Sequence, residues 1–193
     1  MTKSVVLASS SPRRAELLGL LGIPFEVQAA DVDEARRPGE EPGTYVERLA
    51  RSKAAALARN DAVAVGADTI VVHRGSVLGK PEHPAEARAM LERLSGDAHQ
   101  VMTAVAVATV DGGRVLLDSV VETATVRFLP LTDREIDDYL ATGEPLDKAG
   151  AYALQGRGAV LVDSIEGHPT TVVGLPLPAT RRLLARAGVE SLD

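Results

Sequence analysis

The sequence predicts an α/β fold in which helices flank a mixed, twisted sheet. Short Val-rich apolar segments alternate with amphipathic helical segments along most of the chain. A long hairpin pattern interrupts this alternation near the middle, which argues against a purely parallel sheet. The composition is that of an ordinary globular protein, with 45% hydrophobic and 25% charged residues. Because no linker or internal repeat is evident, we expect one domain over residues 1–193, built of two lobes.

The N-terminal segment has the pattern of a strand, a turn and a helix. Residues 4–8 form a short apolar run typical of a buried strand. Ser11 suits the N-cap and Pro12 the first helical position, and Gly22 is the expected stop. A second short strand is predicted around residues 25–28.

The next segment predicts a loop, a helix and a strand. Residues 31–43 are acidic, contain Pro and Gly, and lack periodicity, so we expect a loop there. Thr44 and Glu47 have capping-box spacing, which predicts a helix that opens at Thr44 and runs to about Arg59. Residues 62–72 then predict two strands or one bent strand.

The central segment predicts a helix followed by a hairpin. A helix opens at Pro84 and ends at Gly96. Residues 99–110 and 114–129 are long strand patterns, and the residues that join them are Asp-Gly-Gly, a strong hairpin signal.

The C-terminal segment returns to alternating elements. Thr132 and Glu135 form a second capping-box pattern, and the helix that they open should close at Gly143. Residues 159–165 predict a strand, and residues 178–187 a final helix that stops at Gly188.

Bulk properties exclude several classes of function. A net charge of −6 argues against sequence-independent binding of nucleic acid, which needs a basic surface. The absence of cysteine excludes disulfides, thiolate catalysis and Cys-based zinc sites. The four histidines have no metal-ligand spacing, and no apolar run is long enough for a signal peptide or a membrane span. We therefore expect a cytoplasmic protein with neither nucleic-acid nor membrane partners.

Residues 9–14, with the sequence SSSPRR, have the pattern of an anion-binding turn. A strand that leads into a Pro-initiated helix brings backbone N–H groups and the positive end of the helix dipole to one place. Hydroxyl groups and the guanidinium groups of Arg13 and Arg14 would add donors suited to phosphate oxygens. The alternative is an ordinary Ser N-cap followed by two solvated arginines.

Asp68 is unusual because apolar residues surround it in the sequence. A carboxylate in or beside the core is costly unless it is paired, hydrogen-bonded or bound to a cation. A carboxylate that activates water or holds a metal is what hydrolysis of a phosphoanhydride requires. The alternative is an Asp that bonds to its own backbone in a turn.

Four further residues are candidates for the same chemistry. Lys80 lies in a backbone fixed by Gly79 and Pro81, whereas Lys53 lies on the helix after residue 44. Gln155 lies in a Gly-rich turn where an amide can reach a base or sugar, and Glu34 could reach a metal from the acidic loop. The alternatives are surface lysines, a simple turn and a solvated loop. No P-loop, dinucleotide fingerprint or nucleophile elbow is present.

Six stretches of the sequence resemble the Maf family of nucleotide pyrophosphatases. They follow one another across nearly the whole chain, which makes the resemblance far more specific than any one of them. The stretches are residues 7–14, 66–69, 78–81, 94–103, 147–156 and 173–176.

The resemblance implies hydrolysis of a nucleoside triphosphate to the monophosphate and pyrophosphate, aided by a divalent cation, Mg²⁺ or Mn²⁺. It implies two lobes around a deep cleft, as in the inosine triphosphate pyrophosphatases, and a homodimer. One branch of the family acts on dTTP and UTP and another on 7-methyl-GTP. The residues at 66–69 and 147–152 are similar to the first branch.

The resemblance also implies roles for individual residues. Asp68 would activate the water, and Lys80 and Arg13 would complete the catalytic set by stabilising charge on the departing pyrophosphate. Glu34 would assist Asp68, and the two would hold the metal. The residues expected to bind the substrate are Ser9, Arg13, Arg14, Lys53, Lys80 and Gln155.

Two other functions fit the same residues. A non-catalytic regulator of septum formation or cell division would use the cations to sense a nucleotide without hydrolysing it. A phosphatase would remove the terminal phosphate and leave a diphosphate. Product analysis with purified protein separates these functions.

Overall fold

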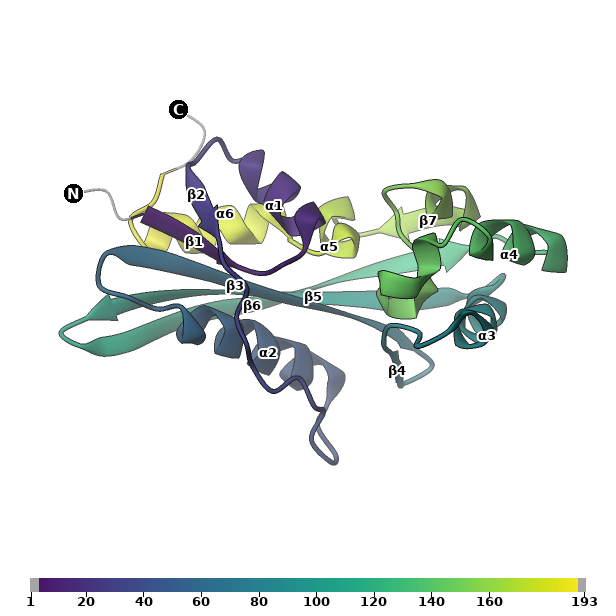
Figure 1. Cartoon of the computed structure of the whole chain (residues 1–193), viewed down its shortest axis with the longest axis horizontal. Coiled ribbons are helices and arrows are strands. Elements are labelled where there is room, and N and C mark those ends of the chain that lie inside the picture. The colour runs from purple at the N-terminus through teal and green to yellow at the C-terminus, as the bar shows by residue number, and fades with distance from the viewer. Residues whose placement is uncertain (1–3, 191–193) are drawn as a thin grey trace. The chain divides into compact units, whose positions relative to one another are not determined.

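The computed structural model describes residues 4–190 and contains a mixed sheet flanked by helices (Figure 1). The seven described strands follow the order β2-β1-β3-β5-β6-β7, and β4 pairs with β3. The α/β prediction is therefore confirmed. The strands are β1 (Ser4–Ala8), β2 (Phe25–Val27), β3 (Ala62–His73), β4 (Ser76–Leu78), β5 (Ala98–Asp111), β6 (Arg114–Phe128) and β7 (Val162–Glu166).

The helices are mostly short, and several begin at proline. Pro12, Pro42 and Pro84 each occupy an early position in a first turn, where the missing N–H costs nothing. The α-helices are α1 (Pro12–Gly19), α2 (Pro42–Ala56), α3 (Pro84–Leu94), α4 (Asp133–Leu140), α5 (Pro169–Val173) and α6 (Leu177–Arg186). The 3₁₀ helices are η1 (Glu144–Asp147), η2 (Ala149–Ala151) and η3 (Arg157–Leu161).

The chain divides into two compact units, which we describe separately. The described residues of the first unit are 4–68, 103–122 and 174–190, and those of the second are 69–102 and 123–173. Strands β3, β5 and β6 each contribute residues to both units.

The first unit contains three neighbouring parallel strands. Strand β1 pairs in parallel with β2 on one side and with β3 on the other, so that Leu7 lies opposite Val27 and Val65. Helices α1 and α6 cover one face of this part of the sheet, and α2 covers the opposite face (Figure 1). The core is aliphatic and includes Leu18 and Leu49, which are almost fully buried.

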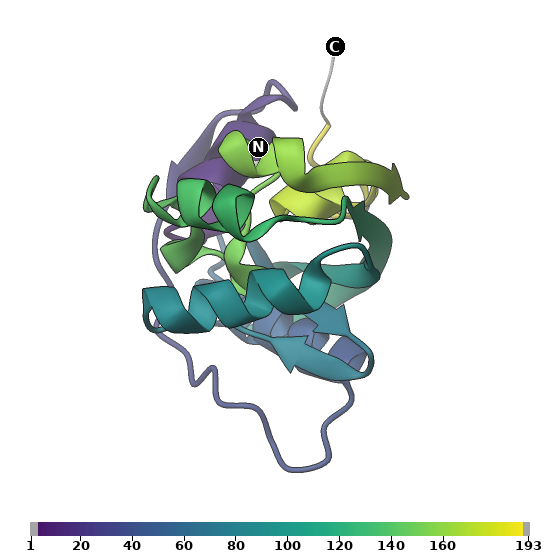
Figure 2. The ribbon, with the colours of Figure 1, turned by 90° about the vertical axis from the view of Figure 1, so that its right-hand side faces the viewer.

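The second unit has a core of its own, in which aromatic rings take part. Helices α3 and α4 lie side by side there (Figure 2). The rings of His99, Phe128 and Tyr152 meet edge to face, with centroids 4.8–5.3 Å apart. Leu91 and Leu94 of α3 pack in the same cluster.

Local signals predicted several elements correctly. The hairpin turn has Gly112 and Gly113 at φ of 54° and 78°, the positive values that a tight two-residue connection requires. The Thr132 side chain accepts from the backbone N–H of Glu135, whose carboxylate in turn accepts from the Thr132 N–H, so the second capping box is confirmed. Residues 62–73 form one continuous strand.

Some predicted boundaries were wrong. Helix α2 begins at Pro42, two residues before the predicted capping box, because proline is well suited to the first turn and the helix is already formed at Thr44. The same helix ends at Ala56 rather than near Arg59, and α1 ends at Gly19 before a turn that reaches Gly22. Residues 159–161, predicted as the start of a strand, belong instead to the 3₁₀ helix η3, which follows Gly156.

Candidate active site

Three chain segments of the first unit meet at one edge of its parallel strands. The turn at residues 9–14 follows β1, the loop with Glu34 follows β2, and Asp68 lies two residues beyond Gly66, the register partner of Ala8. The carboxyl ends of parallel strands are where α/β proteins usually place ligands. The topology thus explains why candidates separated by up to 59 positions come together.

The turn after β1 is held by its own side chains. Ser9 is buried, and its Oγ accepts from the backbone N–H of Ser11 at 3.2 Å and from Arg14 Nη1 at 3.3 Å. Arg14 Nε also donates to the carbonyl oxygen of Gly174, at 2.9 Å. Arg14 therefore ties this turn to the segment that precedes α6, and Arg13 lies half-buried beside it.

Electrostatics link Arg14 to the nearby carboxylates. Burial lowers the pKa of the Arg14 guanidinium, Asp68 and Glu34 oppose that shift, and Arg13 adds to it. An arginine remains charged under such conditions. The edge of the first unit thus carries positive and negative charge in close proximity.

Lys53 lies between two carboxylates. Its Nζ is 2.7 Å from Asp68 Oδ1 and 2.6 Å from Glu34 Oε1. Lys53 and Asp68 are 8% and 9% exposed, whereas the Glu34 side chain is 60% exposed. The arrangement is a buried ion pair with one acidic side chain at its solvent side.

Gly66 lets α2, which carries Lys53, pack closely against β3, which carries Asp68. A Cβ at this position would lie 2.2 Å from the Ala50 carbonyl oxygen and 2.5 Å from the Ala54 backbone nitrogen. Only glycine permits α2 to approach β3 this closely. The glycine of the motif at residues 66–69 is therefore explained by packing, which the sequence pattern did not indicate.

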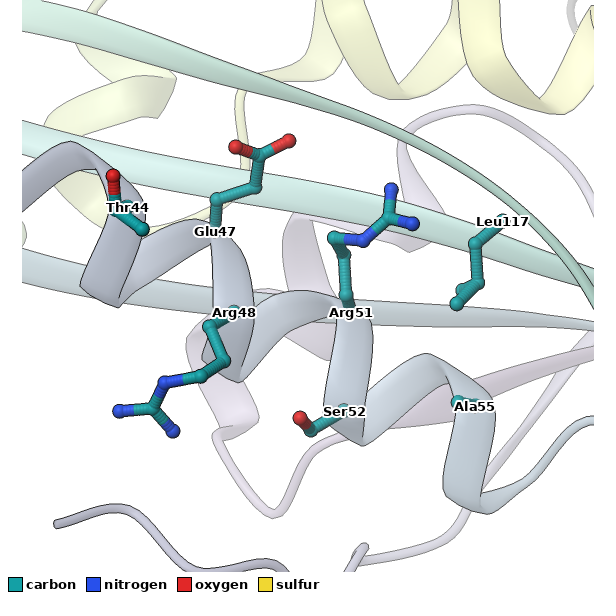
Figure 3. Close-up of a pocket in the computed structure, with 7 residues that line it drawn as sticks. All are labelled: Thr44, Glu47, Arg48, Arg51, Ser52, Ala55 and Leu117. Carbon is teal, nitrogen blue, oxygen red and sulfur yellow. The ribbon is translucent and has the colours of Figure 1, made fainter. Parts of the chain in front are cut away.

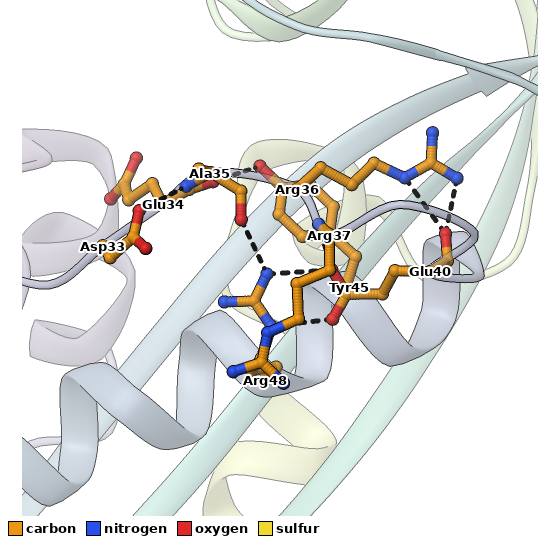
Figure 4. Close-up of polar contacts among 8 residues, drawn as sticks. All are labelled: Asp33, Glu34, Ala35, Arg36, Arg37, Glu40, Tyr45 and Arg48. Carbon is orange, nitrogen blue, oxygen red and sulfur yellow. Dashed lines mark hydrogen bonds and ion pairs between the residues drawn. The ribbon is translucent and has the colours of Figure 1, made fainter.

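The loop at residues 31–41 is bound to α2 by contacts that sequence reasoning missed (Figure 4). Tyr45 Oη donates to the Glu34 carbonyl oxygen, and Arg48 donates both to the Ala35 carbonyl oxygen and to the Glu40 carboxylate. The available signal was a Tyr and an Arg one turn apart at the start of the helix that follows the loop.

A surface pocket of about 530 Å³ is lined by α2 and by Leu117 of β6, and none of the predicted site residues lines it (Figure 3). Two of its lining residues share a partner on β6: Arg51 donates to Ser119 Oγ, and Ser119 Oγ donates to Glu47. The pocket is lined by Thr44, Glu47, Arg48, Arg51, Ser52, Ala55 and Leu117.

The remaining two candidates belong to the second unit. Lys80 and Gln155 are both exposed. The turn with Gln155 is held by Glu144, whose carboxylate accepts from the backbone N–H groups of Arg157 and Gly158 at 3.0 and 3.1 Å. Tyr139 Oη donates to the same carboxylate at 2.9 Å. Glu144 is thus a structural residue that the motif at residues 147–156 did not include.

Neither a metal cluster nor a membrane helix is evident in the described residues. Within residues 4–190, no group of three or more His, Asp or Glu side chains is placed to hold a metal ion. No helix in the same range is both long and apolar enough to cross a membrane.

Comparison with known proteins agrees with the resemblance seen in the sequence. The family model for Maf-like proteins matches residues 4–187. The chain is 54% identical to the dTTP/UTP pyrophosphatase of Anaeromyxobacter sp. (strain Fw109-5), over 97% of this chain and 91% of the relative. It is 49% identical to the protein of the same name from Pseudoalteromonas atlantica, with 94% and 96% covered, and 52% identical to that of Yersinia pestis, with 94% and 92% covered. With both the family model and these relatives spanning nearly all of it, the chain belongs to the Maf family.

Proposed function

We propose that this protein is a nucleotide hydrolase that converts dTTP and UTP to the nucleoside monophosphate and pyrophosphate. The observation that carries the proposal is the Glu34–Lys53–Asp68 arrangement, which lies beside a turn with two arginines. The substrate class follows the names of two relatives, both dTTP/UTP pyrophosphatases, that are about half identical over almost the whole chain.

The chemistry needs an activated water and a stabilised leaving group. Asp68 accepts the proton of the water as its oxygen attacks the α-phosphorus, the bond to the bridging oxygen breaks, and pyrophosphate leaves. Lys53 contacts Asp68 Oδ1, so we assign Oδ2 to the water. Arg13 and the backbone N–H groups of the turn at residues 9–14 bind phosphate oxygens and balance the charge of the leaving group.

The residues present fit a divalent cation. Carboxylate oxygens are the donors that Mg²⁺ and Mn²⁺ prefer, and a Mg²⁺ site is commonly made of one or two carboxylates together with substrate phosphates. Glu34 and Asp68 already place oxygens around one positive charge, that of Lys53 Nζ. When bound, the metal supplies charge neutralisation at the phosphates and orients them.

Three further assignments come from the sequence and the resemblance. Lys80 and Gln155 as substrate-binding residues, a cytoplasmic location and a homodimer each stay a prediction from the sequence. Arg14 donates hydrogen bonds to the Gly174 carbonyl oxygen and to Ser9 Oγ, so we assign it the role of stabilising the turn at residues 9–14.

The test is a product analysis with purified protein. We expect dTTP and UTP to give monophosphate and pyrophosphate with Mg²⁺ or Mn²⁺, and other nucleotides to react more slowly. Diphosphate and inorganic phosphate as products would instead indicate a terminal phosphatase. Nucleotide binding without any product, across several metals, would indicate the non-catalytic regulator.

A further inference from the structure

The loop at residues 31–41 has no regular secondary structure, yet it carries Glu34 to a defined place. The Glu34 carboxylate lies 2.6 Å from Lys53 Nζ although its side chain is 60% exposed. A loop of this length without internal structure holds one conformation only where other contacts fix it. Here hydrogen bonds within the loop, such as those from Arg36 to the Glu40 carbonyl oxygen, are joined by contacts with α2.

Arg48 and Glu40 form the first of these contacts. Arg48 Nε and Nη2 donate to the two Glu40 carboxylate oxygens at 2.7 and 2.8 Å, a bidentate pair. The Glu40 side chain is only 6% exposed, and its carboxylate also accepts from the Arg37 N–H at 3.1 Å. The hydrogen bond from Arg48 lowers the pKa of Glu40 to about 2, so the pair persists at any ordinary assay pH.

The second set of contacts acts on the backbone of Glu34 and its neighbour. Tyr45 Oη donates to the Glu34 carbonyl oxygen at 2.9 Å, and Arg48 Nη2 donates to the Ala35 carbonyl oxygen at 3.0 Å. The Arg48 guanidinium also lies over the Tyr45 ring, 5.5 Å from its centroid, which fixes both side chains. Figure 4 shows the side chains of Tyr45 and Arg48 beside the loop and that of Glu40 within it.

One helix thus holds both partners of the Glu34–Lys53 contact. Tyr45, Arg48 and Lys53 all belong to α2, and the eight steps along the helix from Tyr45 to Lys53 correspond to a rise of about 12 Å. A helix of this length is rigid, so the position of the Glu34 backbone is fixed relative to Lys53 Nζ.

We propose that Tyr45, Arg48 and Glu40 are positioning residues that place the Glu34 carboxylate for the divalent cation. The inference rests on the proposed function, in which Glu34 and Asp68 hold that cation. In this role Tyr45, Arg48 and Glu40 act through Glu34 and do not themselves bind the metal. Loss of these contacts detaches the backbone at Glu34 and Ala35 from α2, so that the Glu34 carboxylate is no longer positioned from its own main chain although Lys53 remains beside it.

The experiment compares Tyr45→Phe, Arg48→Met and Glu34→Gln with the unmodified protein. Free Mn²⁺ is titrated by electron paramagnetic resonance with a dTTP analogue that resists hydrolysis, and kcat and KM for dTTP are measured over a range of Mn²⁺ concentrations. We expect each variant to bind Mn²⁺ about 10- to 100-fold more weakly, the usual effect of removing a residue that orients a ligand. In a double variant that combines Glu34→Gln with Tyr45→Phe, the Mn²⁺ affinity should be less than about twofold weaker than in Glu34→Gln alone.

Arg51→Met is the matched control. Arg51 lies on the same helix and makes a side-chain hydrogen bond of its own, to Ser119 rather than to the loop. Its Mn²⁺ affinity should equal that of the unmodified protein. Urea unfolding of each variant reports whether a change in Mn²⁺ affinity comes from a loss of folding, and Tyr45→Phe, which removes a single hydroxyl group, should stay folded.

The outcomes separate this inference from the proposed function. Unchanged Mn²⁺ affinity in Tyr45→Phe and Arg48→Met, with weaker binding in Glu34→Gln, would overturn the positioning role alone. Equal Mn²⁺ affinity in Glu34→Gln and the unmodified protein would overturn it as well, because Glu34 would then not be a ligand. An unmodified protein that binds Mn²⁺ through Glu34 yet releases no pyrophosphate would overturn the proposed function and leave the positioning result standing.

Discussion

Two buried polar pairs, one in each unit, show how differently the same fold treats polar groups. In the first unit, Lys53 and Asp68 form an ion pair at 2.7 Å. In the second, His99 Nε2 and Tyr152 Oη form a hydrogen bond at 2.8 Å. Lys53 is 8% exposed, and His99 is 2% exposed.

The two pairs differ in charge. Burial lowers the pKa of His99 to about 4, so the histidine is neutral at pH 7, and the pair in the second unit is neutral. A buried ion pair often contributes no more stability than apolar residues of the same volume would. The contribution to stability is thus sufficient to explain why the neutral pair is buried. It does not explain the buried ion pair of the first unit, which is instead consistent with the proposed role of Asp68 in hydrolysis.

The largest expected effect is that of Asp68→Asn on turnover. Loss of a general base should lower kcat for dTTP by about 10²- to 10⁴-fold, because Asn cannot accept the proton of water. Binding of dTTP should persist, since the binding groups of the turn remain. Steady-state pyrophosphate release and equilibrium binding measure the two effects, and near-normal turnover would remove Asp68 from the mechanism.

Lys53→Met should cause the largest loss of stability. Removing one partner of a buried ion pair costs about 3–5 kcal/mol because the other charge stays buried without compensation. Urea unfolding at pH 7 measures the loss. Arg134→Met is the control, since Arg134 and Asp138 form an exposed pair at 3.7 Å on α4 and its loss should cost only about 0–1 kcal/mol. Equal losses in the two variants would contradict the contrast between buried and exposed pairs.

His99 should make stability depend on pH. Its folded-state pKa of about 4 is below the 6.5 of an exposed histidine, mainly through burial, with His73 acting in the same direction and Asp97 opposing. The unfolded chain therefore takes up a proton first as the pH falls. The contribution of His99 to the free energy of unfolding is constant above pH ~6.5 and decreases by about 3 kcal/mol as the pH approaches 4. Urea unfolding between pH 7 and pH 4 should show this slope in the unmodified protein and a smaller slope in His99→Gln.

Among the changes made to the two buried pairs, Tyr152→Phe should have the smallest effect. It removes one hydroxyl and leaves His99 Nε2 buried without that partner, at a cost of about 1–2 kcal/mol. The ring itself keeps its edge-to-face packing with Phe128. A thermal or urea midpoint measured at pH 7 reports the change, and a loss as large as that of Lys53→Met would show that the neutral pair is not the weaker of the two.

Local sequence signals determined most of the fold. The Gly-Gly hairpin turn, the prolines that open helices and the Thr132 capping box each act within four residues, and each appears in the structure. The sequence supplied Asp68 and Glu34 as candidate metal ligands and Lys53 as a candidate for binding the substrate, and the structure brings those three together. The roles assigned to them remain predictions.

Only the tertiary structure decided which residues support that set. The Arg14–Gly174 hydrogen bond spans 160 positions, and the close approach of α2 at Gly66 depends on how a helix packs on a strand. The binding of the loop by Tyr45 and Arg48 depends on where that loop passes over α2. The physical reason is range: propensities and caps act between neighbours in the chain, whereas these contacts arise from strand register and packing, which no short stretch of sequence specifies.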